Sequence, residues 1–236
     1  MTKWLRIQLL IGLSLAVGCH QSPPREPRST EPTLSEQIEA VRGGKKQSIH
    51  LLETKVTDEQ LGQPADLTEL EELILDQGVV TDKGLQSIGS LPNLRHVRLR
   101  KCPITDAGLA HLARLPSLRV INIPHGQFTD DGISLLKSLP LLEQLRISSP
   151  HVGDKSLAAM IEFPNLKRLH LIDVNITDDG LQHVAKMQKL ESFYLDGSSV
   201  SDEAIVALFD ARPELHIHLD QKHHDRDPNA HTHHNE

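Results

Sequence analysis

Apolar residues recur along most of the chain with a period of 24 residues. A pattern LxxLxL, in which each L is leucine or another apolar residue, occurs six times, beginning at Leu70, Leu94, Leu118, Leu142, Leu166 and Leu190. The alternation that ends each copy directs its apolar side chains to one side of a short strand. Partial copies at Ile49 and Ile217 extend the series, so seven repeats fill 46–213 and 214–220 adds a closing strand.

A second phrase follows each predicted strand at a fixed distance. Its copies are VTDEQL, VTDKGL, ITDAGL, FTDDGI, VGDKSL, ITDDGL and VSDEAI, and further apolar residues then recur three apart. A Thr or Ser hydroxyl at a helix start accepts a hydrogen bond from a free backbone N–H, and the Asp that follows lies near the positive end of the helix dipole. Each repeat therefore predicts one strand and one short helix. A single unit cannot bury its apolar face alone, whereas stacked units can.

These repeats resemble the leucine-rich repeat family over about 175 of the 236 residues. The 24-residue length and the TDxGL phrase are most similar to its cysteine-containing subclass, known from F-box-type proteins and bacterial surface proteins. The resemblance implies an α/β solenoid, a horseshoe of about seven repeats with a parallel β-sheet on the concave face and short helices on the convex face. In that subclass a Cys often precedes the TD phrase, and here only Cys102 fills that column. Residues 20–45 are too short and too rich in proline to form an F-box, so a ubiquitin-ligase role does not transfer.

The first 19 residues have the features of an export signal. Lys3 and Arg6 precede an apolar run, 7–17, which is too short for a transmembrane helix and suits secretion. Small residues then lead to Cys19 and resemble the lipobox of bacterial lipoproteins, which implies cleavage after Gly18 and lipidation of Cys19. An ordinary signal peptide with an incidental Cys is the alternative. We therefore expect an exported, lipid-anchored protein of the cell envelope.

The rest of the chain divides into four predicted segments. Residues 20–32 hold four prolines and predict an extended tether. Residues 33–45 begin with the capping-box sequence TLSE, which predicts a helix over 33–42 that covers the first repeat. The repeat domain fills 46–220. The tail, 221–236, is rich in histidine and is expected to be disordered.

Charge and composition exclude several classes of function. The formal net charge is −7 and aromatic residues make up 3% of the chain. An acidic chain with few aromatic rings lacks the basic face and the stacking platforms that bind nucleic acids. The sequence also contains no GxSxG, P-loop, HExxH or CxxC motif, so we expect a protein that is not an enzyme and has no cofactor.

The concave face is the candidate binding surface, because its side chains alternate with the buried leucines of each strand. Its middle repeats are basic, whereas Glu72 and Asp76 lie to one side and Asp196 and Asp220 to the other. Arginine binds carboxylate, phosphate and sulfate groups bidentately, and tyrosine is enriched at binding hot spots. The predicted contacts are His96, Arg98, Arg100, Arg146, Arg168, His170 and Tyr194. The simpler interpretation is a solvated strand surface.

This face leads us to expect a monomer that binds a protein or an anionic polymer. Membrane contact would come only through the lipid anchor.

Two other groups of residues could carry chemistry. Aspartates in register could form a metal ladder, but their place one residue after each capping position favours a helix-start role; they are Asp58, Asp82, Asp106, Asp130, Asp154, Asp178 and Asp202. Cys102 could be a reactive thiol, although a buried apolar role is favoured.

Histidines of the tail could hold zinc, nickel or copper, and they are His223, His224, His231, His233 and His234. No spacing among them fixes a geometry, so only adventitious zinc or nickel is expected there. Metal sequestration through this tail, or a purely structural role in the envelope, are therefore the alternatives to partner binding.

Overall fold

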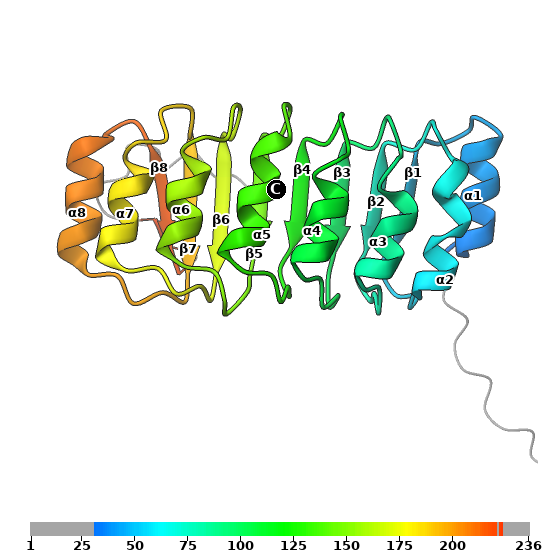
Figure 1. Cartoon of the computed structure of the whole chain (residues 1–236), viewed down its shortest axis with the longest axis horizontal. Coiled ribbons are helices and arrows are strands. Elements are labelled where there is room, and N and C mark those ends of the chain that lie inside the picture. The colour runs from blue at the N-terminus through cyan, green and yellow to red at the C-terminus, as the bar shows by residue number, and fades with distance from the viewer. Residues whose placement is uncertain (1–30, 221, 224–236) are drawn as a thin grey trace, which may run out of the picture. The chain divides into compact units, whose positions relative to one another are not determined.

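Each repeat takes the chain once through a strand and a helix, so all strands stack side by side in one sheet (Figure 1). The computed structural model describes residues 31–220 and the backbone of 222–223. The strands are β1 (Ser48–Leu51), β2 (Glu72–Leu75), β3 (His96–Leu99), β4 (Val120–Ile123), β5 (Gln144–Ile147), β6 (Arg168–Ile172), β7 (Ser192–Asp196), β8 (His216–Leu219) and β9 (Lys222–His223). β1 to β8 are parallel, and β9 pairs with β8 in the antiparallel sense.

The helices form a second layer on one side of this sheet (Figure 1). They are α1 (Leu34–Arg42), α2 (Asp58–Leu61), α3 (Asp82–Ile88), α4 (Asp106–Leu112), α5 (Asp130–Leu135), α6 (Asp154–Met160), α7 (Asp178–Val184) and α8 (Asp202–Ala211), with short 3-10 turns at Gln63–Asp66 and Leu136–Ser138. Parallel strands pair with an offset of 24 residues, as in Arg146 opposite His170. The solenoid predicted from the repeats is therefore confirmed.

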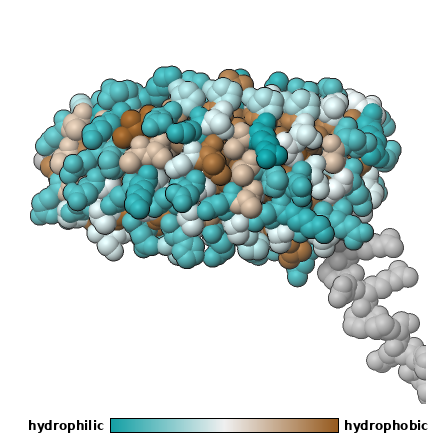
Figure 2. All heavy atoms as spheres, viewed as in Figure 1, coloured by the Kyte–Doolittle hydropathy of each residue, from teal (hydrophilic) through white to brown (hydrophobic). Residues whose placement is uncertain are grey.

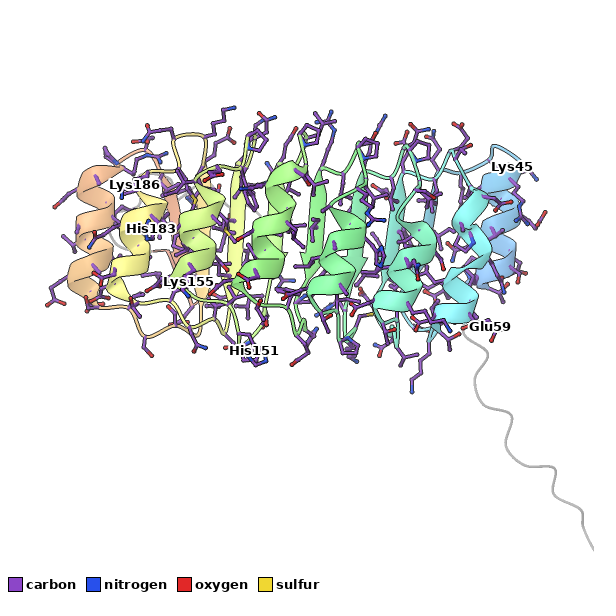
Figure 3. The ribbon with its side chains drawn as sticks, in the orientation of Figure 1. Lys45, Glu59, His151, Lys155, His183 and Lys186 are labelled. Carbon is purple, nitrogen blue, oxygen red and sulfur yellow. The ribbon has the colours of Figure 1, made fainter. Side chains whose placement is uncertain are left out.

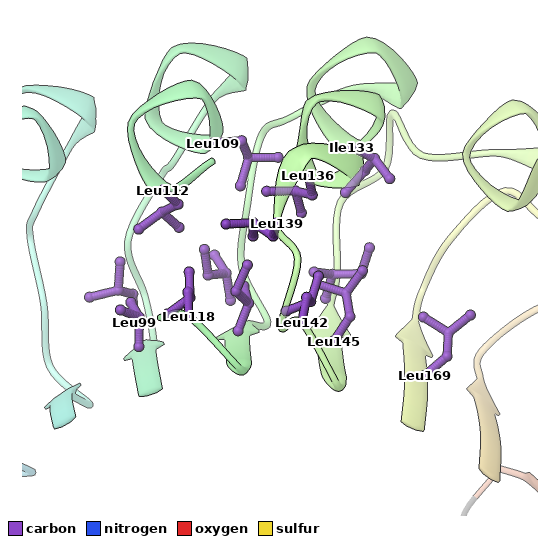
Figure 4. Close-up of a cluster of buried hydrophobic side chains, with 14 of the residues drawn as sticks. Leu99, Leu109, Leu112, Leu118, Ile133, Leu136, Leu139, Leu142, Leu145 and Leu169 are labelled. Carbon is purple, nitrogen blue, oxygen red and sulfur yellow. The ribbon is translucent and has the colours of Figure 1, made fainter. Parts of the chain in front are cut away.

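The core lies between the sheet and the helices, and Figure 4 shows its central part. Leu99 and Leu145 of the strands, and Leu109 and Leu112 of α4, point into this space and are fully buried. Burying one such side chain contributes about 1.5–3 kcal/mol relative to exposure. No helix among residues 31–220 has the length and apolar character needed to cross a bilayer.

The repeated aspartates join one repeat to the next. The carboxylate of Asp82 accepts hydrogen bonds from the backbone N–H and the hydroxyl of Thr105, at 2.9 and 2.6 Å. The same pair of bonds joins Asp58 to Thr81, Asp106 to Thr129, Asp154 to Thr177 and Asp178 to Ser201. The predicted helix-start role is therefore incomplete: each of these aspartates begins its own helix, but its carboxylate binds the N-cap residue of the following helix.

This bridge also explains the glycine of the TDxGL phrase. A Cβ atom on Gly108 would lie 2.3 Å from Oδ1 of Asp82, and one on Gly132 would lie 2.1 Å from Oδ1 of Asp106. The single GDKSL copy exchanges the roles, because Gly153 replaces the threonine and Ser156 replaces the glycine. The Ser156 hydroxyl then donates to Asp130, which also accepts from the Gly153 N–H at 2.8 Å.

Buried polar side chains form hydrogen bonds to the backbone in the first and last repeats of the described solenoid. The Gln37 amide of α1 is buried and forms two hydrogen bonds with the backbone of His50 in β1, at 2.7 and 2.8 Å. It thereby takes the place of a neighbouring strand at the sheet edge. In the last repeat the buried Arg212 guanidinium donates to the carbonyls of Met187 and Leu190, at 2.7 and 2.9 Å.

Replacing Asp106 by alanine should destabilise the fold by about 1–3 kcal/mol, because it removes both bridging bonds to Thr129. Urea unfolding followed by circular dichroism measures the change. The control is Asp131→Ala, an exposed first-turn aspartate of α5, for which we expect a change within about 0.5 kcal/mol. Equal losses in the two variants would show that the bridge is unimportant.

Candidate binding face

The face of the sheet that no helix covers within the described residues, hereafter the open face, carries all seven predicted contact residues. Strand residues alternate between this face and the core, as Arg98 does with the fully buried Val97 and Leu99. The 24-residue register then aligns one residue from each strand in a single row across the sheet. From β3 to β8 this row is Arg98, Asn122, Arg146, His170, Tyr194 and His218.

Ion pairing divides the basic residues of the open face into two groups. Arg98 forms a close ion pair with Asp76, whose carboxylate also lies 3.7 Å from Nη1 of Arg100. Arg146 and Arg168 form no ion pair with any residue that the structure describes. Arginines without a direct ion pair are therefore found on β5 and β6, and Arg98 is mainly a structural partner of Asp76.

A relay of hydrogen bonds fixes Arg146. Its Nε donates to Nδ1 of His170 at 3.2 Å, and Nε2 of His170 lies 2.9 Å from the Asp196 carboxylate. Burial lowers the pKa of His170 more than Asp196 raises it, and the charge of Arg146 lowers it further. A neutral ring with its proton on Nε2 satisfies both contacts.

Tyr194 stands among histidines at the C-terminal end of the face. Its ring centroid lies 5.4 Å from that of His170 and 4.6 Å from that of His218. His216 is buried beside them, and its Nε2 is 2.7 Å from Nε2 of His218. These ring contacts fix the position of Tyr194 and leave its side chain half-buried. An aromatic ring held in this way can contact a binding partner.

A pocket of about 390 Å³ opens beside Arg146, where strands β3 to β6 end. Its lining includes Arg100, His125, Arg146, Ser148 and Asp173. The sequence analysis missed His125, which lies in the loop after β4 and outside the alternating strand positions. The one sequence feature that could have pointed to His125 is its position in the repeat, because it lies 24 residues after the basic residue Lys101.

The metal predictions concern side chains that the structure does not describe. His224, His231, His233 and His234 lie outside the described residues, and only the backbone of His223 is described. Within the described part, no group of three or more His, Cys, Asp or Glu side chains could hold a metal ion. Cys19 also lies outside the described residues.

Comparisons with known proteins agree with this geometry. A family model described as "Leucine Rich repeat" matches residues 90–113, which is one repeat length. The structure is similar to internalin C2 of Listeria monocytogenes, with a TM-score of 0.56 and 22% identity over 77% of this chain and 91% of that one. The chain therefore has the leucine-rich repeat fold.

A second internalin of Listeria monocytogenes, inlF, is 18% identical with a TM-score of 0.50, over 77% of this chain and 58% of that one. No curated protein sequence matches. At these identities the likeness concerns the leucine-rich repeat fold, so any function has to be argued from the residues of the open face.

Cys102 is fully buried in the core of the solenoid, as expected. Its thiol lies 3.4 Å from the Arg100 carbonyl, and burial raises the pKa of the thiol to about 11. The thiolate is the reactive form of cysteine. A Cys19→Ser variant should therefore show almost no reaction with a thiol reagent at pH 8 until urea unfolds it. Rapid stoichiometric labelling of the folded variant would contradict the assignment.

Stability should decrease as the pH falls from 7 towards 5. Burial, together with nearby arginines, lowers the pKa values of His96, His125 and His170 in the folded protein. The unfolded chain, with histidine pKa values near ~6.5, then binds more protons in this range, so acid favours unfolding. Urea unfolding at several pH values measures the slope.

The matched variants for this slope are His170→Gln and His151→Gln, the latter an exposed loop histidine. His170→Gln should reduce the pH dependence, whereas His151→Gln should leave it unchanged. An identical slope in all three proteins would exclude His170 as a source.

Proposed function

We propose that this leucine-rich repeat protein is an exported, lipid-anchored binding protein, without enzymatic activity, that recognises a protein or an anionic macromolecule through the open face. The observation that carries the proposal is the basic pair Arg146 and Arg168, neither of which forms an ion pair with a described residue. A protein with net charge −7 that concentrates positive charge on its uncovered sheet has a surface suited to an acidic partner.

The fold supports this proposal because stacked repeats give an extended surface made of many short strands. Tyr194 lies in the same row as Arg146 and adds a rigid aromatic contact beside the basic pair. Aromatic and arginine side chains together are enriched among interface residues that contribute most binding energy.

The predicted lipid anchor would determine where in the cell the protein acts. A lipid on Cys19 would hold the chain at a membrane, and the proline-rich segment 20–32 would separate the repeats from its surface.

The helical side of the molecule provides controls. Figure 2 shows that this side is covered mainly by hydrophilic residues, and Figure 3 labels Lys155 and Lys186 on it. Both lysines are exposed and make no ion pair with a described residue. A double change to glutamate there alters the net charge as much as a double change on the open face.

Affinity capture from an envelope extract tests the proposal. The baits are the tagged protein, Arg146→Glu/Arg168→Glu, Lys155→Glu/Lys186→Glu, and a chain that ends at Asp220. We expect the open-face variant to lose at least ~10-fold of the captured partner, because two favourable charge contacts become repulsive. Arg98 is left unchanged, since glutamate there would face Asp76 and weaken the fold.

Equal capture by the two double variants would contradict the proposal. Loss only in the chain that ends at Asp220 would instead favour metal or partner binding through the histidine-rich tail. Capture of nothing by any bait would favour a structural role in the envelope.

A further inference from the structure

The pocket beside Arg146 lies where four parallel strands end at the same edge of the sheet. Arg100 follows β3, His125 follows β4, Ser148 follows β5 and Asp173 follows β6. The repeat register therefore brings together residues that are about one repeat length apart in the chain. The pocket, of about 390 Å³, borders the open face because Arg146 lines it and also belongs to the row of that face.

Positive groups outnumber acids in this pocket. Arg100 and Arg146 line it, against a single lining carboxylate, Asp173, and the charge of Lys101 acts on the lining residue His125. Asp76 lies 3.7 Å from Arg100, but it is already in close contact with Arg98. The pocket thus keeps an excess of positive charge in a partly enclosed position, where solvent screens it less than on an open surface.

The positive groups also act on one another. Burial lowers the pKa of Arg146, and the charges of Arg100 and Arg98 lower it further. Burial likewise lowers the pKa of His125, together with the charges of Arg100, Lys101 and Arg146. Crowded like charges destabilise one another, and a bound anion would relieve that repulsion.

Several hydrogen-bond donors of the pocket are available to such an anion. Arg146 uses Nε for His170, and its Nη nitrogens have no hydrogen-bond partner among the described residues. Nδ1 of His125 accepts from the Lys101 N–H at 3.2 Å, which places the proton of the neutral ring on Nε2. Two guanidinium groups, an imidazole N–H and the Ser148 hydroxyl together exceed what one carboxylate can accept.

We propose that this pocket binds a phosphoryl group, held by Arg100, His125, Arg146 and Ser148. A phosphate offers three or more acceptor oxygens and close to two negative charges, which matches two arginines and two neutral donors. The pocket is larger than one phosphate ion, so it has room for part of the molecule that carries the group. The inference rests on the proposed function in one respect, since it names the chemistry that the open face would recognise.

Calorimetric titration of the full-length protein with inorganic phosphate tests the pocket. We expect saturable heat at pH 7 and constant ionic strength, and at least 10-fold weaker binding by Arg146→Gln and by Arg100→Gln. The matched control is Arg114→Gln, an exposed arginine that follows α4 and lies outside the pocket lining, which should bind phosphate normally. Sodium acetate, titrated in the same way, tests a simple carboxylate.

A second measurement follows the His125 ring by NMR, with its signal identified by loss in His125→Gln. Phosphate should raise the pKa of His125, because a bound dianion offsets the positive charges of Arg100, Lys101 and Arg146 that act on this ring. The carboxylate of Asp173, which also lines the pocket, is present with and without phosphate and does not cause the change. In Arg146→Gln the phosphate-dependent rise should be lost or greatly reduced.

Three results would overturn the inference: no saturable heat with phosphate, equal affinity for acetate, or equal weakening in Arg114→Gln and Arg146→Gln. These outcomes separate the two proposals. Partner capture that depends on Arg146 and Arg168 without any phosphate binding would leave the proposed function standing and overturn only the pocket. Phosphate binding without capture on the open face would overturn only the proposed function.

Discussion

The bond between an aspartate and the N-cap residue of the following repeat sets how successive turns of this solenoid fit together. Asp82 holds both the N–H and the hydroxyl of Thr105, and the same geometry recurs at most junctions of the described chain. Hydrophobic burial drives the layers together but has no direction, whereas these bonds require one relative position of two helix starts. The bridge also dictates glycine at positions such as Gly108, since any side chain there would meet the carboxylate.

A fixed junction has a direct consequence for the open face. Because each strand is displaced from the last by one repeat, residues 24 apart become neighbours in a row, as Arg146 and His170 do. The core leucines and the bridging aspartates stabilise the fold from the other side of the sheet and from the helix starts. The scaffold can therefore present charged residues on this face, and on β5 and β6 these include Arg146 and Arg168, which form no ion pair with a described residue.

The first and last repeats of the described chain use hydrogen bonds that the middle repeats do not have. An interior strand has a neighbour on both sides, whereas β1 has its open edge covered by the side chain of Gln37, which bonds to both backbone groups of His50. At the other end Arg212 donates to carbonyls of the preceding repeat. The backbone of one residue offers one N–H donor and one C=O acceptor. One amide side chain such as that of Gln37 can therefore satisfy both groups of His50.

The sequence by itself determined the repeat length, the strand and helix of each repeat, and the outward positions such as Arg98 and Arg146. These follow from local periodicity, which a linear pattern records completely. Only the tertiary structure decided that Asp76 neutralises Arg98 and that the aspartates bridge between repeats. It also brought His125, from a loop, into a pocket with Arg100 and Arg146. These relations depend on side-chain directions and on distances between turns, which a one-dimensional pattern does not contain.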